Sequence, residues 1–270
     1  MPTELNINAP LTLISYGRSG TSLISNIMGM SSDIHFVGET AGLIFFTALG
    51  LEVSKDVVDL SHPDFKAKGP ECIRQLFLRL FQSEKARWFQ KPIGIPEAFN
   101  TLFNKTTDEK NIWYWNVLKE TFPDALYLTV LRNPIDVAVS SVLYWGYNVP
   151  DTMNQLARMA EIITHPLSLI SYAVLYDNLV EQPQREISEL CRWAHLDYSD
   201  DMLKALDVRH VPSTSNIELE RATLLAVIEG PELPLMIESV CKMWRRFGHD
   251  NVNFREDSEY VKRNIDFLSA

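Results

Sequence analysis

The chain contains few cysteines, which argues against a disulfide framework. There are three among 270 residues, an odd number. Cys72, Cys191 and Cys241 each fall within a helical pattern, at spacings that do not suit metal ligation. We therefore expect reduced, mostly buried thiols in a reducing compartment, and no metal site.

No stretch of the sequence is apolar enough to cross a bilayer. The longest uncharged runs, such as Ile162–Tyr176, contain proline or histidine and fall short of the roughly 20 apolar residues that a membrane helix needs. Met1–Pro10 lacks the basic residues that open a secretory signal peptide, and no repeat or low-complexity tract is present. The sequence therefore favours a cytoplasmic protein without a membrane span.

Basic side chains are in deficit, since 25 lysines and arginines stand against 35 acidic residues, for a formal net charge of −10. This balance argues against a nucleic-acid partner, although it allows a local basic pocket. The length and a hydrophobic content of 46% suit one large α/β domain, so we predict a single domain over residues 1–270. The oligomeric state is left open.

The most informative stretch is Leu11–Met30, with the sequence LTLISYGRSGTSLISNIMGM. Leu11–Tyr16 is a short run of strand formers, and Ser22–Met30 carries apolar residues at helical spacing. The pattern predicts a strand, a tight loop and a helix. Because the first backbone N–H groups of a helix are unpaired and the helix dipole is positive there, the loop is suited to binding a phosphate or sulfate group.

The residue types in this loop suit an anion. Glycines let the backbone wrap the anion, an arginine adds a permanent charge, and hydroxyls add donors. We assign to this site Gly17, Arg18, Ser19, Gly20, Thr21 and Ser22. The simpler alternative is a strand-to-helix turn without a ligand. The loop also departs from the Walker A motif, because Thr21 follows Gly20 where that motif has its phosphate-binding lysine.

A second candidate anion site follows the buried run Ala125–Leu131, which predicts a strand. Arg132 stands at the end of this strand, and a helix is predicted over Ile135–Tyr144. Ser140 lies eight positions after Arg132, a little over one turn into the helix. An arginine fork with a nearby hydroxyl is suited to a phosphate monoester. The alternative is that Arg132 pairs with Asp136 or another carboxylate.

Strands alternate with helices along the chain. Further strands are predicted at Ile34–Val37, Arg87–Ile93 and Pro166–Leu175, helices at Ala41–Leu51, Glu71–Gln82, Glu97–Asn104, Ile112–Phe122, Pro183–Ala194, Pro234–Phe247 and Glu256–Leu268, and a surface loop at Ser54–Pro70. This alternation predicts an α/β fold with a mainly parallel central sheet, helices on both faces and a P-loop-like phosphate-binding loop. Such sheets bind ligands at the carboxyl ends of their strands, where both candidate anion sites lie.

Three segments match the parts of one known pattern. They are YGRSGTSL (Tyr16–Leu23), LRNPIDVAVSS (Leu131–Ser141) and LYDNLVEQP (Leu175–Pro183). The first two resemble the donor-binding signatures of the PAPS-dependent sulfotransferase family, and the third is similar to its Tyr-Glu-Asp-Leu segment and the proline helix that follows. The segments occur in the family's order and cover most of the chain. Asp177 and Asn178 depart from the family's Glu-Asp pair.

The resemblance implies that the chain binds PAPS, 3′-phosphoadenosine 5′-phosphosulfate, as a sulfuryl donor. Arg18–Ser22 would bind the 5′-phosphosulfate, Arg132 and Ser140 the 3′-phosphate, and Tyr176 would lie by the adenine. The resemblance also implies metal-free, in-line transfer to an acceptor hydroxyl, less often an amine, with 3′-phosphoadenosine 5′-phosphate as product. Two separate anion sites, as the residues themselves suggest, agree with such a nucleotide.

The resemblance also indicates catalytic residues. Glu39 stands where several bacterial, carbohydrate and tyrosylprotein branches of the family place a glutamate base, and His35 is the reserve candidate because imidazole titrates near neutral pH. The alternative for Glu39 is to offset the dipole of a helix over Thr40–Leu51. Lys91 resembles the lysine of the family's Lys-Pro segment and would stabilise the bridging oxygen together with Arg18. Its alternative is an ordinary solvated lysine.

The acceptor is indicated only as a small molecule, a lipid or a carbohydrate. Aromatic groups at Phe45–Phe46, Trp113–Trp115 and Tyr144–Tyr147 are candidates to line a pocket for a lipid, a phenol or a sugar ring, and their alternative is the core. The basic residue that completes the 3′-phosphate site is left open among Arg209, Arg221, Arg245 and Arg246.

Two other functions stay open. A P-loop-type small-molecule or nucleoside kinase should carry a Walker A lysine after Gly20 and an acidic Mg²⁺ ligand at the end of the second strand, where the sequence has Thr21 and Arg132. A non-catalytic nucleotide-binding regulator would bind PAPS without turnover.

Overall fold

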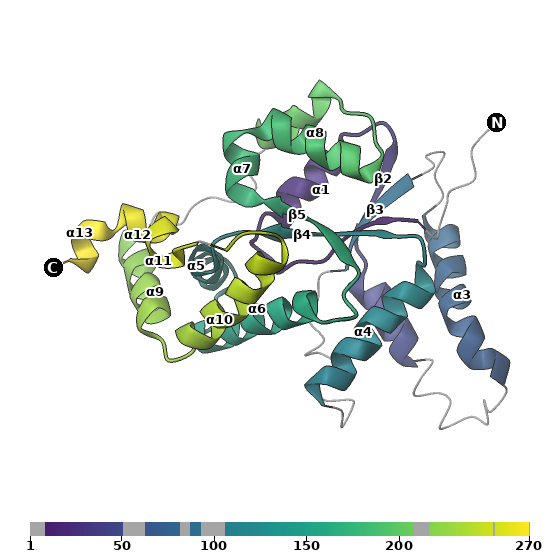
Figure 1. The fold of residues 1–270 in the computed structure, drawn as a ribbon, viewed down its shortest axis with the longest axis horizontal. Coiled ribbons are helices and arrows are strands. Elements are labelled where there is room, and N and C mark those ends of the chain that lie inside the picture. The colour runs from purple at the N-terminus through teal and green to yellow at the C-terminus, as the bar shows by residue number, and fades with distance from the viewer. Residues whose placement is uncertain are drawn as a thin grey trace.

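A computed structural model describes residues 9–50, 63–81, 87–92, 106–207, 216–250 and 252–269. Within these ranges one parallel sheet has the strand order β2-β3-β1-β4-β5 (Figure 1). The strands are β1 (Leu11–Leu13), β2 (Ile34–Glu39), β3 (Arg87–Lys91), β4 (Leu126–Leu131) and β5 (Ile170–Leu175). The prediction of a parallel α/β sheet is therefore confirmed.

Helices cover both faces of the sheet. The helices are α1 (Thr21–Gly29), α3 (Pro63–Leu80), α4 (Thr107–Thr121), α5 (Pro134–Trp145), α6 (Val149–Thr164), α7 (Tyr176–Glu181), α8 (Pro183–Ala194), α9 (Ile217–Glu229), α10 (Leu233–Arg246), α11 (Phe254–Asp257), α12 (Glu259–Arg263) and α13 (Ile265–Leu268), with the helical turns η1 (Gly42–Phe46) and η3 (Asp200–Asp207). In Figure 1, α1, α7 and α8 lie above the sheet and α3, α4, α6 and α10 below it.

The buried core has one part on each face, and β4 contributes to both. Leu128 and Val130 pack into the cluster shared with α1 and α8, whereas Tyr127 and Leu131 pack into the larger cluster on the other face. This alternation follows from the two-residue period of a strand. A strand buried on both faces reads as a continuous apolar run, which is why it was predictable from sequence.

The order of the strands creates a switch point between β1 and β4. From β1 the chain runs through α1 to β2 on one side, and from β4 it runs through α5 and α6 to β5 on the other. Connections that leave two adjacent strands in opposite directions open a crevice at the carboxyl ends, where ligands of such sheets bind. Both candidate anion sites therefore lie at this crevice.

Several predicted elements differ from the structure. Helix α3 begins at Pro63, inside the predicted loop Ser54–Pro70, and continues through Pro70. Proline removes one backbone hydrogen bond without ending this helix, whose later turns bury Ile73 and Phe77. The predicted C-terminal helix Glu256–Leu268 is divided into α11, α12 and α13. The division between α11 and α12 falls at Ser258, whose side chain caps α12 by accepting a hydrogen bond from a backbone N–H of that helix.

Other differences concern single residues and unassigned stretches. Tyr176 begins α7, a helix that was not predicted, and Cys72 is exposed rather than buried. Helix α6 was not predicted. The predicted helix Glu97–Asn104 lies outside the described residues.

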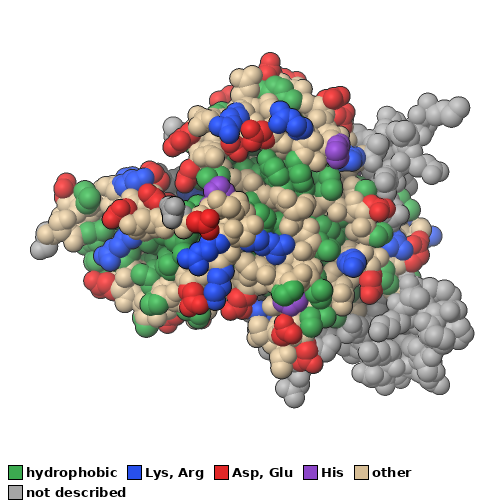
Figure 2. Space-filling model, viewed as in Figure 1, with side chains coloured by type: hydrophobic (Ala, Val, Ile, Leu, Met, Phe, Trp, Pro, Cys, Tyr) green, Lys and Arg blue, Asp and Glu red, His purple; other side chains and the backbone are tan. Residues whose placement is uncertain are grey.

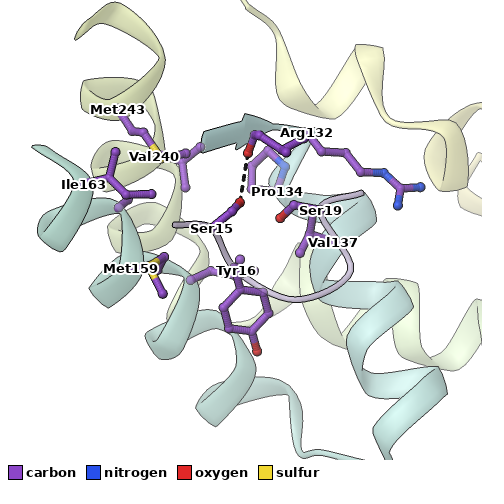
Figure 3. A pocket seen from close by; sticks show the side chains of 13 residues that line it. Ser15, Tyr16, Ser19, Arg132, Pro134, Val137, Met159, Ile163, Val240 and Met243 are labelled. Carbon is purple, nitrogen blue, oxygen red and sulfur yellow. Dashed lines mark hydrogen bonds between the residues drawn. The ribbon is translucent and has the colours of Figure 1, made fainter. Parts of the chain in front are cut away.

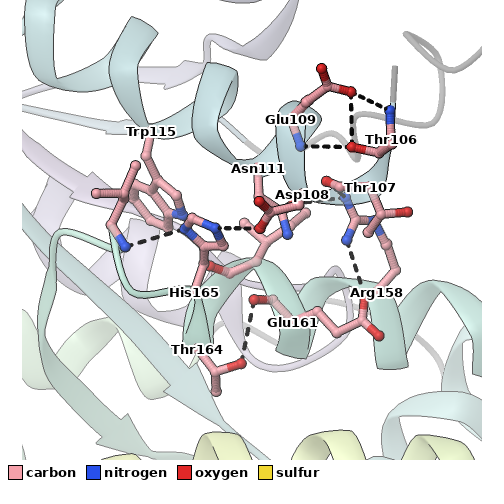
Figure 4. A network of polar contacts seen from close by, with 12 residues as sticks. Thr106, Thr107, Asp108, Glu109, Asn111, Trp115, Arg158, Glu161, Thr164 and His165 are labelled. Atoms are coloured by element: carbon pink, nitrogen blue, oxygen red, sulfur yellow. Dashed lines mark hydrogen bonds and ion pairs between the residues drawn. The ribbon is translucent and has the colours of Figure 1, made fainter. Parts of the chain in front are cut away.

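Helix α6 is fastened to α4 by polar contacts (Figure 4). His165, which caps the end of α6, lies with its Nε2 3.1 Å from the Asp108 carboxylate. Arg158 donates to the side-chain oxygen of Asn111 at 2.7 Å. These contacts hold α6 against α4.

Surface charge, helix apolarity and clusters of ligating side chains bear on whether nucleic acid, a membrane or a metal ion binds the chain. The face in Figure 2 carries acidic and basic side chains interspersed, rather than one broad basic surface. No helix in the described ranges is both long and apolar enough to cross a membrane. The same ranges contain no cluster of three histidine, cysteine or acidic side chains placed to hold a metal ion.

Candidate active site

The loop between β1 and α1 leads directly into the N-terminus of the helix. Gly20 precedes α1 with φ of 106°, and no side chain caps the helix within the described residues. The first turn of α1 contains no acidic residue. The N-terminus of α1 therefore presents backbone N–H groups and a positive dipole end to the crevice.

Both glycines of the loop are required by close packing. A Cβ at Gly20 would lie 2.5 Å from Cδ2 of Tyr176, and a Cβ at Gly17 would lie 2.3 Å from Cη2 of Trp145. No larger residue fits at either position unless these rings move. The loop is thus held between an aromatic ring from α7 and one from α5.

Arg18 connects the loop to α5. Its backbone has φ of 66°, which is uncommon for a residue with a side chain. Its Nε donates to the Ser140 hydroxyl at 3.1 Å, and its guanidinium lies 4.4 Å from the centre of the Tyr144 ring. Burial, and then the positive charge of Arg132, lower the pKa of Arg18.

Arg132 joins the end of β4 to the same loop. Its Nη1 donates to the backbone carbonyl of Arg18 at 2.8 Å, and its guanidinium lies 4.2 Å from the centre of the Tyr176 ring. The sequence suggests two separate anion sites. The structure instead brings Arg18, Arg132 and Ser140 into one cluster, with Tyr176 beside it.

Asp136 does not form the ion pair with Arg132 that the sequence left open as an alternative. Its carboxylate accepts hydrogen bonds from the hydroxyl of Ser258 at 2.5 Å and from the backbone N–H groups of Glu259 and Tyr260 at 3.1 and 3.2 Å. Asp136 therefore holds the start of α12. This contact spans more than 120 residues of sequence, so no local pattern could have indicated it.

Asn133 binds the same C-terminal segment. Its side-chain oxygen accepts from the N–H of Ile135 at 3.0 Å, which caps α5, and its amide donates to the carbonyl of Phe254 at 2.8 Å. We call Asn133 and Asp136 together the C-terminal clamp. Through it the loop that carries Arg132 also positions residues 254–260.

Glu39 and Lys91 meet at the carboxyl ends of β2 and β3, where they are paired in register. Lys91 Nζ lies 3.2 Å from Glu39 Oε1. The lysine side chain is only 11% exposed and the glutamate side chain is 66% exposed. Lys91 is therefore not an ordinary solvated lysine. Glu39 is the last residue of β2 and lies two positions before the helical segment that begins at Ala41. His35 lies four residues earlier in β2.

A buried glutamine supports this pair. Gln90, which precedes Lys91, donates to the Thr12 hydroxyl at 3.0 Å and accepts from the Thr40 hydroxyl at 2.9 Å. It thereby links β3 to β1 and to the residue after Glu39. A glutamine inside a buried strand is a signal that sequence reasoning could have used and did not.

A small cavity lies behind the loop (Figure 3). Its volume is about 20 Å³, which is room for one water molecule and not for a nucleotide. Ser15, Tyr16 and Ser19 line one side, and apolar residues of α6 and α10 line the other. The Arg132 guanidinium points away from this cavity (Figure 3). The cavity therefore belongs to the support of the loop.

Two of the four arginines considered for the 3′-phosphate, Arg221 and Arg246, have other contacts, and Arg245 is exposed in the last turn of α10. Arg246 donates to the backbone carbonyls of Ile163 at 2.6 Å and Ile170 at 3.2 Å, and Arg221 donates to the Asn264 side chain at 3.2 Å. Both fasten elements of the fold. Arg209 lies outside the described residues.

A parallel α/β sheet with an anion-binding loop after its first strand defines a class of phosphate-binding proteins. Residues 10–200 match the sequence model of the sulfotransferase family, so the chain belongs to that family. The match includes every proposed site residue and leaves the C-terminal segment outside it.

Two solved structures have a similar fold. The sulfotransferase domain of the Synechococcus PCC 7002 olefin synthase is 13% identical with a TM-score of 0.55, covering 93% of this chain and 99% of that one. Sulfotransferase STF9 from Mycobacterium avium is 14% identical with a TM-score of 0.50, covering 90% and 77%. At such identities the likeness shows the sulfotransferase fold alone.

A curated relative is an uncharacterized protein of Aquifex aeolicus strain VF5, 22% identical over 231 residues. The match covers 78% of this chain but only 29% of that protein. The chain thus spans less than a third of the length of this relative.

Proposed function

We propose that the chain is an enzyme that moves a sulfuryl group from PAPS to an acceptor hydroxyl, or less readily an amine. The observation that carries the proposal is the cluster at the switch point. There an uncapped helix N-terminus, two arginines and the Ser140 hydroxyl lie within contact of one another. Such a cluster suits a donor that carries phosphate at one end and phosphosulfate at the other.

In this proposal the loop from Gly17 to Ser22 binds the 5′-phosphosulfate, and Arg132 with Ser140 binds the 3′-phosphate. Without the donor, Arg18 donates a hydrogen bond to the Ser140 hydroxyl. Donor binding would replace that hydrogen bond with bonds from both side chains to phosphate oxygens. Tyr176, which packs on Gly20 and under Arg132, forms the wall for the adenine.

The residues near the reacting atoms have separate roles. Glu39 accepts the acceptor's proton as the new sulfur–oxygen bond forms and the bond from sulfur to the donor's bridging oxygen breaks. Lys91 and Arg18 neutralise the charge that develops on that bridging oxygen in the leaving 3′-phosphoadenosine 5′-phosphate. This assignment places the chain with the glutamate-base bacterial, carbohydrate and tyrosylprotein branches, and the reserve base is His35. The acceptor is a small molecule, a lipid or a carbohydrate.

Calorimetric titration without metal tests the donor. The protein should bind 3′-phosphoadenosine 5′-phosphate more tightly than ADP, and Arg132→Ala should remove that preference. Arg185→Ala is the matched control, because Arg185 is an exposed arginine of α8 that pairs with Glu189. Equal or better binding of ADP, or a strict need for Mg²⁺, would overturn the proposal in favour of a kinase.

Turnover of PAPS tests the catalytic residues. Glu39→Gln should lower the turnover number while leaving the affinity for 3′-phosphoadenosine 5′-phosphate near that of the unmodified protein. Tight binding of that nucleotide without turnover for any acceptor would favour a nucleotide-binding regulator instead.

A further inference from the structure

One of the three aromatic groups of the sequence has all of its rings at the surface. Phe45 and Trp113–Trp115 are buried in the core, whereas Phe46 is 55% exposed. Tyr144, Trp145 and Tyr147, at the end of α5, are 53%, 39% and 47% exposed. We call these last three residues the aromatic platform. Exposed rings gathered in one place are characteristic of binding surfaces.

The rings of the platform contact one another. The centres of Tyr144 and Trp145 lie 5.7 Å apart in an edge-to-face arrangement, and those of Trp145 and Tyr147 lie 5.3 Å apart in a stack. The platform is therefore a connected surface that can receive a flat ring by stacking or by edge contact.

The platform also touches the proposed donor loop. Trp145 packs on Gly17 so closely that no Cβ fits between them, and Tyr16 meets the Trp145 ring edge-to-face at 6.3 Å. The Arg18 guanidinium lies over the Tyr144 ring. The platform thus lies at the Gly17 end of the loop, whereas Tyr176 packs at the Gly20 end.

We propose that the aromatic platform binds the acceptor, and that the acceptor is an alcohol carried on a ring with a flat apolar face. This inference rests on the proposed sulfotransferase function. The acceptor oxygen must approach the sulfur from the side opposite the leaving oxygen, so the acceptor lies next to the loop and beyond the donor. The ring is an arene or the C–H face of a sugar, since both present a flat apolar surface to an aromatic side chain.

Calorimetry on the protein saturated with 3′-phosphoadenosine 5′-phosphate tests this inference with three probes. Naphthol represents an arene, methyl glucoside a sugar ring, and octanol an apolar alcohol without a ring. At least one ring probe should bind the unmodified protein. Its affinity should fall roughly tenfold in Trp145→Ala and stay close to the original in Trp145→Phe, which keeps a flat ring. Octanol binding should not depend on Trp145.

Two further variants separate ring binding from damage to the loop. Tyr147→Ala removes a ring that stacks on Trp145 and leaves the packing of Trp145 on Gly17 in place, so it should weaken the ring probe and not the nucleotide. Trp193→Ala removes another stacked tryptophan, whose ring centre lies 4.8 Å from that of Tyr172 in β5, and should change neither affinity.

The outcomes distinguish the two proposals. Absence of nucleotide binding to the unmodified protein would overturn the sulfotransferase proposal and the platform with it. Normal nucleotide binding combined with ring binding that survives both Trp145→Ala and Tyr147→Ala, or with no ring binding at all, would overturn the platform alone. Binding of naphthol or of methyl glucoside identifies which kind of ring the acceptor carries.

Discussion

The carboxylate of Asp136 gives a quantitative test of how the site is assembled. It is 2% exposed and accepts three hydrogen bonds from residues 258–260. A hydrogen bond to a charged group contributes about 1.5–3 kcal/mol, but bonds that share one acceptor do not add fully. We therefore expect Asp136→Ala, which leaves three donors unpaired, to loosen this segment by about 3 kcal/mol. Asp136→Asn keeps one acceptor oxygen and should cost about half as much.

Amide hydrogen exchange measures this loss where it occurs. Asp136→Ala should speed exchange at Glu259 and Tyr260 by about a hundredfold, while the amides of α8 keep their protection. Asp151→Ala is the matched control, because Asp151 is an exposed carboxylate whose partner, Asn148, lies in the same helix cap. It should leave exchange in α12 unchanged. Unchanged exchange at both amides in Asp136→Ala would refute the reasoning.

Three further predictions concern single residues. Gly20→Ala should lower the free energy of unfolding, measured by urea denaturation, by about 1–2 kcal/mol because position 20 has a positive φ. The loss should be larger still because the new Cβ would contact Tyr176. Equal stability of the variant and the unmodified protein would contradict the loop geometry. Burial raises the pKa of Asp177, so its ionised form is disfavoured in the folded state. Asp177→Asn should therefore stabilise the protein near neutral pH. The gain in stability should vanish below about pH 4, where the carboxyl of Asp177 is protonated in both the folded and the unfolded state. Under native conditions an aromatic disulfide reagent should modify exposed Cys72 rapidly and spare Cys191, which is buried and whose pKa is raised to about 11 by burial; equal rates would contradict this.

Local sequence signals predicted the elements that position the site. The run Ala125–Leu131 and the proline at position 134 define β4 and the start of α5 without reference to the rest of the chain. Helix α6 was missed although its cap, Asn148, and its buried apolar face are local signals. At Pro70 the local rule was misleading, because packing of the later turns of α3 outweighs one lost hydrogen bond.

The contacts that unite the site join residues far apart in sequence. The hydrogen bond from Arg18 to Ser140 spans 122 positions, as does the one from Ser258 to Asp136. Residue type indicated that Arg18 and Arg132 suit anions, but not that they lie side by side. Equally, composition could not separate Trp145 at the surface from the tryptophans at 113 and 115 in the core, because burial depends on how helices pack.

The proximity of Arg18 and Arg132 gives an expectation about which ligand the proposed donor site favours. The charge of Arg132 contributes to the lowered pKa of Arg18, which means that the two cations repel each other in the free protein. Burial increases this repulsion because less water screens it. A ligand with negative charge at both ends relieves the repulsion at both guanidiniums, whereas adenosine relieves it at neither. Donor affinity should therefore fall steeply as salt is added, and binding of a neutral acceptor to the aromatic platform should not.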